Sequence, residues 1–327
     1  MSHHAAERTA LGSVLALWAA GLGAAGQYGK IAVAYEMMPA LYPGAGAALG
    51  WAVSLVGVVG IVLGVVAGVV VGRMGLRRAM LGGLLAGAAL SGLQALAPPF
   101  WLFLALRLAE GAAHLALVVA APTLISEMFF GVAFALIAAA GLPLAARHGV
   151  PALFLAHGLW MLACAGLLAV LLPRDRPAGG GLPGPAEIAA QSLRLYRSPR
   201  IGAPALGWLF YTFSFVSLLT LVPPWIEAPW RGPTVTAMPL VSILASLTLG
   251  VALLRILPAV TVVRLGFALS AAGAAAFLLA PGHPALCLFV SGAMGLVQGA
   301  SFAAVPELNA PPGDRALANG GLAQMGN

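Results

Sequence analysis

Gly72-Arg73-Met74-Gly75-Leu76-Arg77-Arg78 is a short cationic stretch between two long apolar runs. Three arginines this close together cannot lie in hydrocarbon, because each would cost several kcal/mol at the centre of a bilayer. The stretch therefore lies at a membrane surface, and short loops rich in arginine stay on the cytoplasmic side. It fixes the orientation of the two apolar runs that flank it, which we expect to be membrane spans.

The composition of the whole chain favours the same environment. Of 327 residues, 61% are hydrophobic and 8% are charged, and the mean hydropathy is +1.00. Soluble domains carry about 25% charged residues, so this chain has too little polar surface to cover a water-soluble globule. The net charge of +7 does not indicate a nucleic-acid-binding protein, because the basic residues are spread over loops instead of clustering with aromatic residues on one face.

Ten segments are apolar and long enough to cross a bilayer, which takes about 20 residues. The fold class predicted is therefore an all-α membrane protein. The one clear linker, rich in Pro, Gly and Arg, follows the sixth segment and contains a short amphipathic stretch at 187–197. The expected spans are 9–41, 47–71, 79–97, 100 to between 121 and 127, 129–146, 150–172, 200–226, 233–254, 258–280 and 284–308.

Basic residues decide the expected orientation. With a cytoplasmic N-terminus, twelve of the sixteen basic residues fall on the cytoplasmic side, and only Arg147 and Arg231 fall outside. Because positive charge in loops stays inside, we expect a multi-pass protein of the plasma membrane, of the bacterial inner-membrane type, with its N-terminus in the cytoplasm. The remaining two, Lys30 and Arg107, lie within spans.

The order of spans and linker predicts a transporter built from two halves. We expect a six-helix bundle at 1–172, a cytoplasmic linker at 173–199, an incomplete four-helix bundle at 200–310 and a polar cytoplasmic tail at 311–327.

Two motifs resemble those of the major facilitator superfamily (MFS). The run from Gly68 through Gly72-Arg73-Met74-Gly75 to Arg77-Arg78 is similar to the loop between the second and third helices of that family, except that Gly72 replaces an Asp and Leu76 is inserted. The fourth span contains Arg107-Leu-Ala-Glu110-Gly111, like the family's Arg-x-x-x-Gly. The resemblance implies an MFS-type helical bundle of about 10 transmembrane helices that works by alternating access.

The sequence around Gln27-Tyr28-Gly29-Lys30 and Ala120-Ala121-Pro122-Thr123 resembles bacterial members of the family near the cyanate and nitroimidazole transporters. Against the family pattern, the chain is internally shortened at Ser126-Glu127-Met128 and lacks the last two helices. The sequence therefore reads as a shortened and truncated member.

Ionisable residues inside spans are functional candidates by default, because insertion penalises them unless they face a cavity or a partner. Lys30 and Arg107 lie at similar depth on helices that line the central cavity in this family, so we expect them to bind an anionic substrate, with polar help from Gln27 and Gln298. Alternatively each cation has only a structural partner, such as Glu110 one turn from Arg107.

Glu110 and His114 are one helical turn apart and are the candidates for proton coupling. The alternative for His114 is an ordinary hydrogen-bonded packing residue, which is also how His157 in the sixth span is interpreted. From the resemblance, the cationic loop is expected to act as a gate, although it also serves as a topology signal. Its residues are Gly68, Gly72, Arg73, Gly75, Arg77 and Arg78.

No metalloprotease, nucleophile-elbow or P-loop motif occurs in the sequence, so we expect no enzyme activity and no cofactor. The first hypothesis is a symport: secondary transport of a small organic or inorganic anion with protons. The partners expected are that small-molecule substrate, protons and the lipid bilayer, and no nucleic acid; substrate identity, direction and oligomeric state stay open. The second hypothesis is export of hydrophobic drugs or metabolites, and the third is a remnant without transport activity. The export hypothesis would use Trp208, Phe210, Tyr211, Phe213 and Phe215 of the seventh span.

Overall fold

The computed structural model describes residues 3–120, 136–174 and 183–326. Most residues in these ranges are helical, and no strand forms among them. The helices divide into two compact units, Met1–Gln191 and Ser192–Gly326. Helix α9 (Pro185–Arg197) begins in the first unit and ends in the second. The predicted all-α fold is therefore observed.

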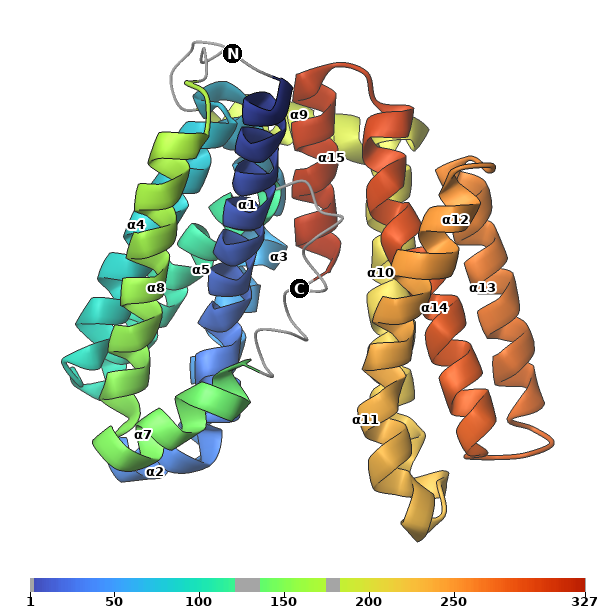
Figure 1. Ribbon diagram of the computed structural model, residues 1–327, viewed down its shortest axis with the longest axis horizontal. Helices are drawn as coiled ribbons and strands as arrows, with labels where there is room; N and C mark the ends of the chain where they lie inside the picture. The colour runs from blue at the N-terminus through green and yellow to red at the C-terminus, as the bar shows by residue number, and fades with distance from the viewer. Residues whose placement is uncertain (1–2, 121–135, 175–182, 327) are drawn as a thin grey trace. The chain divides into compact units, whose positions relative to one another are not determined.

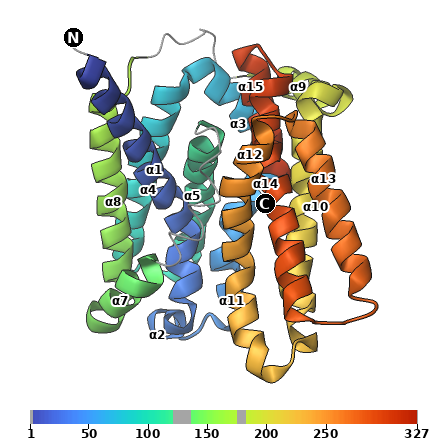
Figure 2. The ribbon, with the colours of Figure 1, turned by 45° about the vertical axis from the view of Figure 1, so that its right-hand side comes forward.

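Five long helices run side by side in the first unit (Figure 1, Figure 2). Helix α4 packs along both α5 and α8, α3 packs along α5, and α1 packs along α8. These helices are mostly made of Ala, Gly, Leu and Val, so apolar side chains cover every face and leave few positions where polar side chains can meet. The five are α1 (His3–Val33), α3 (Leu49–Met74), α4 (Leu76–Ala95), α5 (Phe100–Ala120) and α8 (Val150–Leu171).

The first predicted span is shorter than expected. Helix α1 ends at Val33, and residues up to 41 form two short helices instead of continuing the span. Met38 lies in the first turn of the second short helix and is fully buried with Ile31 and Phe103 in an apolar cluster, so the chain bends to bring it there. The short elements of this unit are η1 (Tyr35–Met37), α2 (Met38–Leu41), η2 (Gly46–Ala48), the π-helical η3 (Ile137–Gly141) and α7 (Leu142–His148).

Glycine lets the central helices of this unit approach closely. A Cβ atom on Gly111 would lie 2.8 Å from the Val56 carbonyl oxygen, so α5 can rest against α3 only with glycine at this position. In membranes, small residues let two helices approach closely and associate through van der Waals packing, because lipid provides no hydrophobic driving force for association. The glycine of the Arg-x-x-x-Gly motif is therefore a packing residue beside Glu110.

In the second unit, α14 (Pro284–Leu308) is the helix against which α10, α11 and α13 pack. Helix α15 (Pro312–Met325) packs along α10. The sequence predicts a polar tail there, yet Leu317 and Leu322 of α15 are buried. The other elements are α10 (Pro199–Leu221), η4 (Pro223–Trp225), α11 (Ala228–Ala245), the π-helical η5 (Ser246–Gly250), α12 (Val251–Leu254) and α13 (Ala259–Ala276).

In the described ranges, seven helical segments are long and apolar enough to cross a membrane. Helices α1 and α4 have the length of spans but are not among the seven. Much of the predicted fifth span and the shortened stretch Ser126-Glu127-Met128 lie outside the described residues, so the count of ten stays a prediction. The seven are Gly46–Met74, Phe100–Ala120, Val150–Leu171, Pro199–Trp225, Ala228–Leu254, Ala259–Ala276 and Pro284–Leu308.

Candidate functional site

Three charged side chains meet in the interior of the first unit: Lys30 of α1 with Arg107 and Glu110 of α5. All three are completely buried. The Glu110 carboxylate uses both oxygens, accepting from Lys30 Nζ at 2.6 Å on Oε1 and from Arg107 Nη1 on Oε2. Buried charges need such pairing, because an unpaired ion in a medium of low dielectric constant is strongly unfavourable.

Polar groups from two further helices complete this set, which we call the charge cluster: Lys30, Ser91, Gln94, Arg107, Glu110 and His157. Gln94 Nε2 of α4 donates to Glu110 Oε2 at 2.7 Å. Lys30 Nζ also donates to Ser91 Oγ at 2.6 Å. The charge cluster thus joins α1, α4, α5 and α8, four helices that pack along one another.

Hydrogen-bond partners fix the direction of the bonds around His157. Its Nε2 lies 2.9 Å from the Gly23 carbonyl oxygen, which only accepts, so Nε2 carries the proton. In a neutral ring Nδ1 then accepts from Ser91 Oγ, 2.8 Å away. The result is a directed chain in which Lys30 donates to Ser91, Ser91 to His157, and His157 to the α1 backbone.

Arg107 is held by backbone carbonyl groups of two helices as well as by Glu110. Its Nε donates to the Ala52 oxygen of α3 at 2.6 Å, and its Nη1 donates to the Gln27 oxygen of α1 at 2.9 Å. The remaining nitrogen, Nη2, is buried and has no hydrogen-bond partner among the described residues. The same is true of Gln27 Nε2 and Gln94 Oε1. A buried polar atom without a partner is rare and calls for an explanation.

His114 lies on the same helix as Glu110 but contacts a different neighbour. Its Nδ1 lies 3.1 Å from both Gln27 Oε1 and the Ala24 carbonyl oxygen, so Nδ1 donates to them. The Tyr28 ring packs edge-on against it with centroids 5.0 Å apart. His114 thus connects to the charge cluster through Gln27, whose backbone oxygen accepts from Arg107 Nη1.

The formal charges of the cluster do not balance. Lys30 and Arg107 contribute two positive charges and Glu110 one negative charge, which leaves +1 if both histidines are neutral. Isolated charge inside a membrane protein is costly and is usually compensated by a partner or an ion. The unbalanced charge and the unpartnered Arg107 Nη2 both fit a small group that carries one negative charge.

The cationic stretch contains a one-residue connection between α3 and α4, which we call the joint. Helix α3 continues to Met74 and α4 starts at Leu76, so only Gly75, with φ of 86°, separates them. Arg73 pairs with Glu187 of α9, and Arg77 Nη2 donates to the Ala169 carbonyl oxygen near the end of α8 at 2.7 Å. Arg78 is exposed, and Gly68 is buried one turn before Gly72. The joint is thus tied to the ends of α8 and α9.

Two predicted sets belong to the second unit and are not members of the charge cluster. Gln298 on α14 is buried and accepts a hydrogen bond from Ser242 Oγ at 3.2 Å. On α10, Tyr211 stacks with Trp208 and Phe215 on one face, whereas Phe210 and Phe213 are 59% and 71% exposed on another. The five aromatic side chains therefore do not line one common surface.

Reasoning from the sequence singled out Lys30, Arg107, Glu110, His114 and Gln27, and the structure brings these together. It missed Ser91 and Gln94, and it interpreted His157 as packing. A usable signal exists: Ser91 and Gln94 are three residues apart, hence on one face of a helix that is otherwise nearly free of polar side chains in its second half. Glu127 lies outside the described residues.

A comparison with protein families explains the two motifs. Residues 6–327 match the Major Facilitator Superfamily profile. The chain belongs to this superfamily. MFS proteins are secondary transporters, so this chain is a multi-pass membrane transporter and not an enzyme. The family resemblance of the motifs is thereby confirmed, and the cyanate branch stays a prediction.

Solved MFS structures share the fold at low identity. The E. coli fucose:proton symporter FucP superimposes with a TM-score of 0.69 at 14% identity, covering 95% of this chain and 88% of that one. The human organic anion transporter MFSD10 (TETRAN) gives a TM-score of 0.60 at 18% identity, covering 96% and 90%. No curated protein matches the chain significantly by sequence. These likenesses establish the fold.

Proposed function

We propose that this MFS protein transports a small monovalent anion together with protons by alternating access, with the charge cluster as its binding site. Lys30, Arg107 and Gln27 bind the anion, and Glu110 and His114 carry the coupling proton. Gln298 remains a candidate polar contact to substrate in the second unit. An exporter of hydrophobic compounds would need an apolar cavity, whereas the buried polar groups of the first unit favour an anion.

Arg107 carries the proposal. Its guanidinium is fully buried and oriented by three acceptors, the Ala52 and Gln27 carbonyl groups and Glu110, yet Nη2 has no partner. A carboxylate or another planar anion is the natural acceptor for a guanidinium N–H, because the bond is charge-assisted on both sides. Gln27 Nε2, a second buried donor without a partner, belongs to the residue whose backbone oxygen holds Arg107.

Proton coupling follows from competition for Glu110. While ionised, its carboxylate engages both Lys30 and Arg107. Protonation removes the negative charge, so the two cations are free to attract the anion, and an anion in turn stabilises the cluster once Glu110 is protonated. Proton and anion therefore favour each other's binding, as symport requires. His114 communicates with the site through its bond to Gln27 Oε1.

The joint between α3 and α4 is assigned the gating role, through the Arg73–Glu187 pair and the bond from Arg77 to Ala169. The family motif has an Asp at the position of Gly72, and in this chain Glu187 supplies a carboxylate in its place. We place the N-terminus and this joint on the cytoplasmic side of a plasma membrane of the bacterial inner-membrane type, on the basis of the charge asymmetry of the loops.

Uptake into proteoliposomes tests the proposal. A panel of small labelled monoanions is supplied with and without an inward proton gradient, for the wild type and for Lys30→Ala, Lys30→Arg and Arg147→Ala. Arg147→Ala is the control, because it removes an exposed positive charge. We expect uptake that the gradient stimulates, that Lys30→Ala abolishes and that Arg147→Ala preserves.

Lys30→Arg separates folding from binding, because it keeps the ion pair with Glu110 but moves the charge. It should fold like the wild type and transport poorly. Saturable uptake retained in Lys30→Ala would remove Lys30 from the binding site, and no uptake of any anion by the wild type would favour a protein without transport activity.

A further inference from the structure

His157 of α8 has hydrogen-bond partners that suit it both as a neutral ring and as a cation. Its Nε2 donates to the Gly23 carbonyl oxygen at 2.9 Å, and its Nδ1 lies 2.8 Å from Ser91 Oγ. A carbonyl oxygen and a hydroxyl oxygen can both accept, so a proton added at Nδ1 finds an acceptor in Ser91. The ring can therefore take up a proton without leaving a buried donor unpaired.

Two glycines make room for the His157 ring. Gly158 lets α8 rest on α4 near Ser91, because a Cβ atom there would lie 3.0 Å from the Ala88 carbonyl oxygen. On α1, a Cβ atom on Gly26 would lie 2.9 Å from His157 Cδ2, so the ring occupies space that a larger residue would fill. The position of the ring between α1 and α4 thus depends on two residues without side chains.

Ser91 connects His157 to Glu110. Its Oγ donates to the neutral ring, and the same oxygen lies 3.4 Å from Glu110 Oε1, toward which the hydroxyl hydrogen can also point. A hydroxyl oxygen has two lone pairs and one hydrogen, so Ser91 can accept from Lys30 and a protonated ring while its hydrogen points to the carboxylate. The distance to the carboxylate is long for such a bond and must shorten to about 3 Å before a proton can move.

Exposure distinguishes the two ends of this path. Glu110 and Ser91 are completely buried, whereas His157 is 8% exposed. A proton from outside therefore reaches the carboxylate through a neighbour, and the hydroxyl of Ser91 provides the connection from His157. The other histidine, His114, is 4% exposed and connects to the charge cluster through Gln27.

The charges around His157 favour passing the proton on. Helix α8 packs along α1, α4 and α7. Lys30 of α1 and Arg107 of α5 repel a positive charge on the ring, and Glu110 attracts the proton. A proton on the ring is therefore better placed on the carboxylate once an anion has engaged the two cations. The ionisable side chains of α4 and α7 lie near helix ends and are Arg77, Arg78, Arg147 and His148.

We propose that His157 and Ser91 form a proton relay to Glu110; this inference rests on the proposed function, in which Glu110 binds the coupling proton. The proton on His157 Nδ1 moves to Ser91 Oγ as the hydroxyl hydrogen of Ser91 moves to Glu110 Oε1. One proton is transferred: the imidazolium becomes a neutral ring, the carboxylate becomes a carboxylic acid, and Ser91 remains a hydroxyl.

Time-resolved infrared spectroscopy of the purified full chain, after a light-triggered release of protons, tests the relay. The carboxylic acid band of Glu110 is identified by its loss in Glu110→Gln. We expect this band to appear about tenfold or more slowly in Ser91→Ala and in His157→Gln than in the wild type, and to reach a similar final height. His157→Gln keeps an N–H for the Gly23 oxygen but cannot carry a proton.

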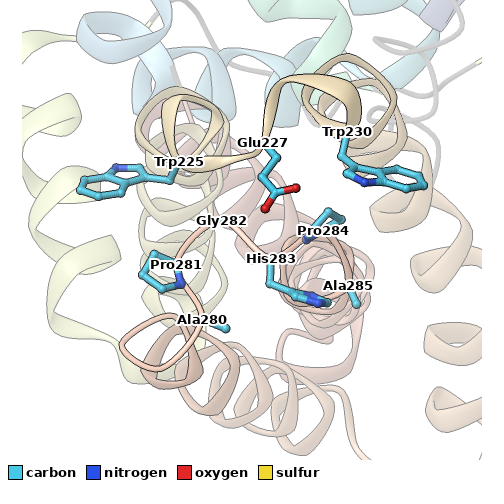
Figure 3. A pocket seen from close by; sticks show the side chains of 9 residues that line it. All are labelled: Trp225, Glu227, Trp230, Ala280, Pro281, Gly282, His283, Pro284 and Ala285. Carbon is cyan, nitrogen blue, oxygen red and sulfur yellow. The ribbon is translucent and has the colours of Figure 1, made fainter.

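Ser54→Ala and His283→Gln are the matched controls, and both should show the wild-type rate. Ser54 is an exposed serine of α3, and His283 is an exposed histidine that lines a pocket in the second unit together with Glu227 (Figure 3). Wild-type rates in Ser91→Ala and His157→Gln, or equally slow rates in the controls, would overturn the relay and leave the role of Glu110 in place. Absence of the Glu110 band in the wild type would overturn the relay and the proposed proton coupling together.

Discussion

Lys30 and Glu110, 80 positions apart in the sequence, form an ion pair of 2.6 Å in which neither side chain is exposed. Because Arg107 shares the same carboxylate, the two ends of the pair are not equivalent. Lys30→Met leaves Glu110 matched to Arg107 and a net charge of zero, whereas Glu110→Gln leaves two buried cations. We expect Glu110→Gln to lower the free energy of unfolding by about 3 kcal/mol or more, and Lys30→Met to lower it less. Denaturant titration of the purified variants measures both values, and the reverse order would contradict the charge assignment.

Glu110→Gln also tests coupling. The amide cannot ionise, so a proton gradient should no longer drive accumulation of the anion, while exchange of internal for external anion continues. Gln94→Leu is the control, because it removes a hydrogen bond to Glu110 but leaves its ionisation in place. Gradient-driven accumulation by Glu110→Gln would exclude this carboxylate as the coupling group.

Arg107→Lys keeps the charge but loses the planar set of donors. A lysine ammonium cannot reach the Ala52 oxygen, the Gln27 oxygen and Glu110 together while offering a further donor to substrate. We expect anion affinity to fall about tenfold or more, since 1.4 kcal/mol corresponds to a factor of ten. Competition binding measures it, with Arg147→Lys as the control. Unchanged affinity would mean that Arg107 only holds the helices together.

Gly111→Ala tests the contact between α5 and α3. The new Cβ would lie 2.8 Å from the Val56 oxygen, which is backbone and cannot move alone, so the helices must separate. We expect a loss of about 1–3 kcal/mol in stability. Gly92→Ala, where nothing lies within 4 Å of the new atom, should have little effect or stabilise its helix slightly. Equal thermal stability of the two variants would contradict the close approach.

The pair between Arg73 and Glu187 should contribute little at high salt. Its side chains are 26% and 39% exposed, and exposed pairs are worth about 0.2–1 kcal/mol. A double-mutant cycle with Arg73→Gln and Glu187→Gln, measured by denaturation at low and high salt, should give a coupling energy in this range that falls as salt rises. Arg78→Gln replaces Arg73→Gln in the control cycle, and comparable coupling there would show that the effect is not specific to the pair.

The sequence was sufficient to predict the family and the helical fold. It was also sufficient to find the three charged residues of the cluster, because an ionisable residue in an apolar helix is conspicuous. Ser91 and Gln94 were missed because neutral polar residues are common in membrane helices and carry no charge signal. The contact between Lys30 and Glu110 depends on how α1 and α5 pack, which hydropathy does not encode.

One predicted boundary was wrong and one helix was not foreseen, for similar reasons. The apolar character of the chain continues beyond Val33, so composition did not reveal that the helix ends there. At the other end, the Ala-Gly-Asn composition of 316–321 looked like a tail, although small residues are what permits tight packing: a Cβ on Gly321 would lie 2.9 Å from the Leu195 side chain. The small residues were interpreted as part of a polar tail, whereas they allow close contact between helices.

The joint at Gly75 has a mechanical consequence. A single residue with φ of 86° leaves no slack between α3 and α4, so a tilt of one helix must carry the adjoining end of the other. Helix α3 supplies the Ala52 oxygen that accepts from Arg107. Helix α4 supplies Ser91, which accepts from Lys30, and Gln94, which donates to Glu110. Because Gly75 alone joins them, α3 and α4 should move together, and with them the groups that hold all three charged side chains.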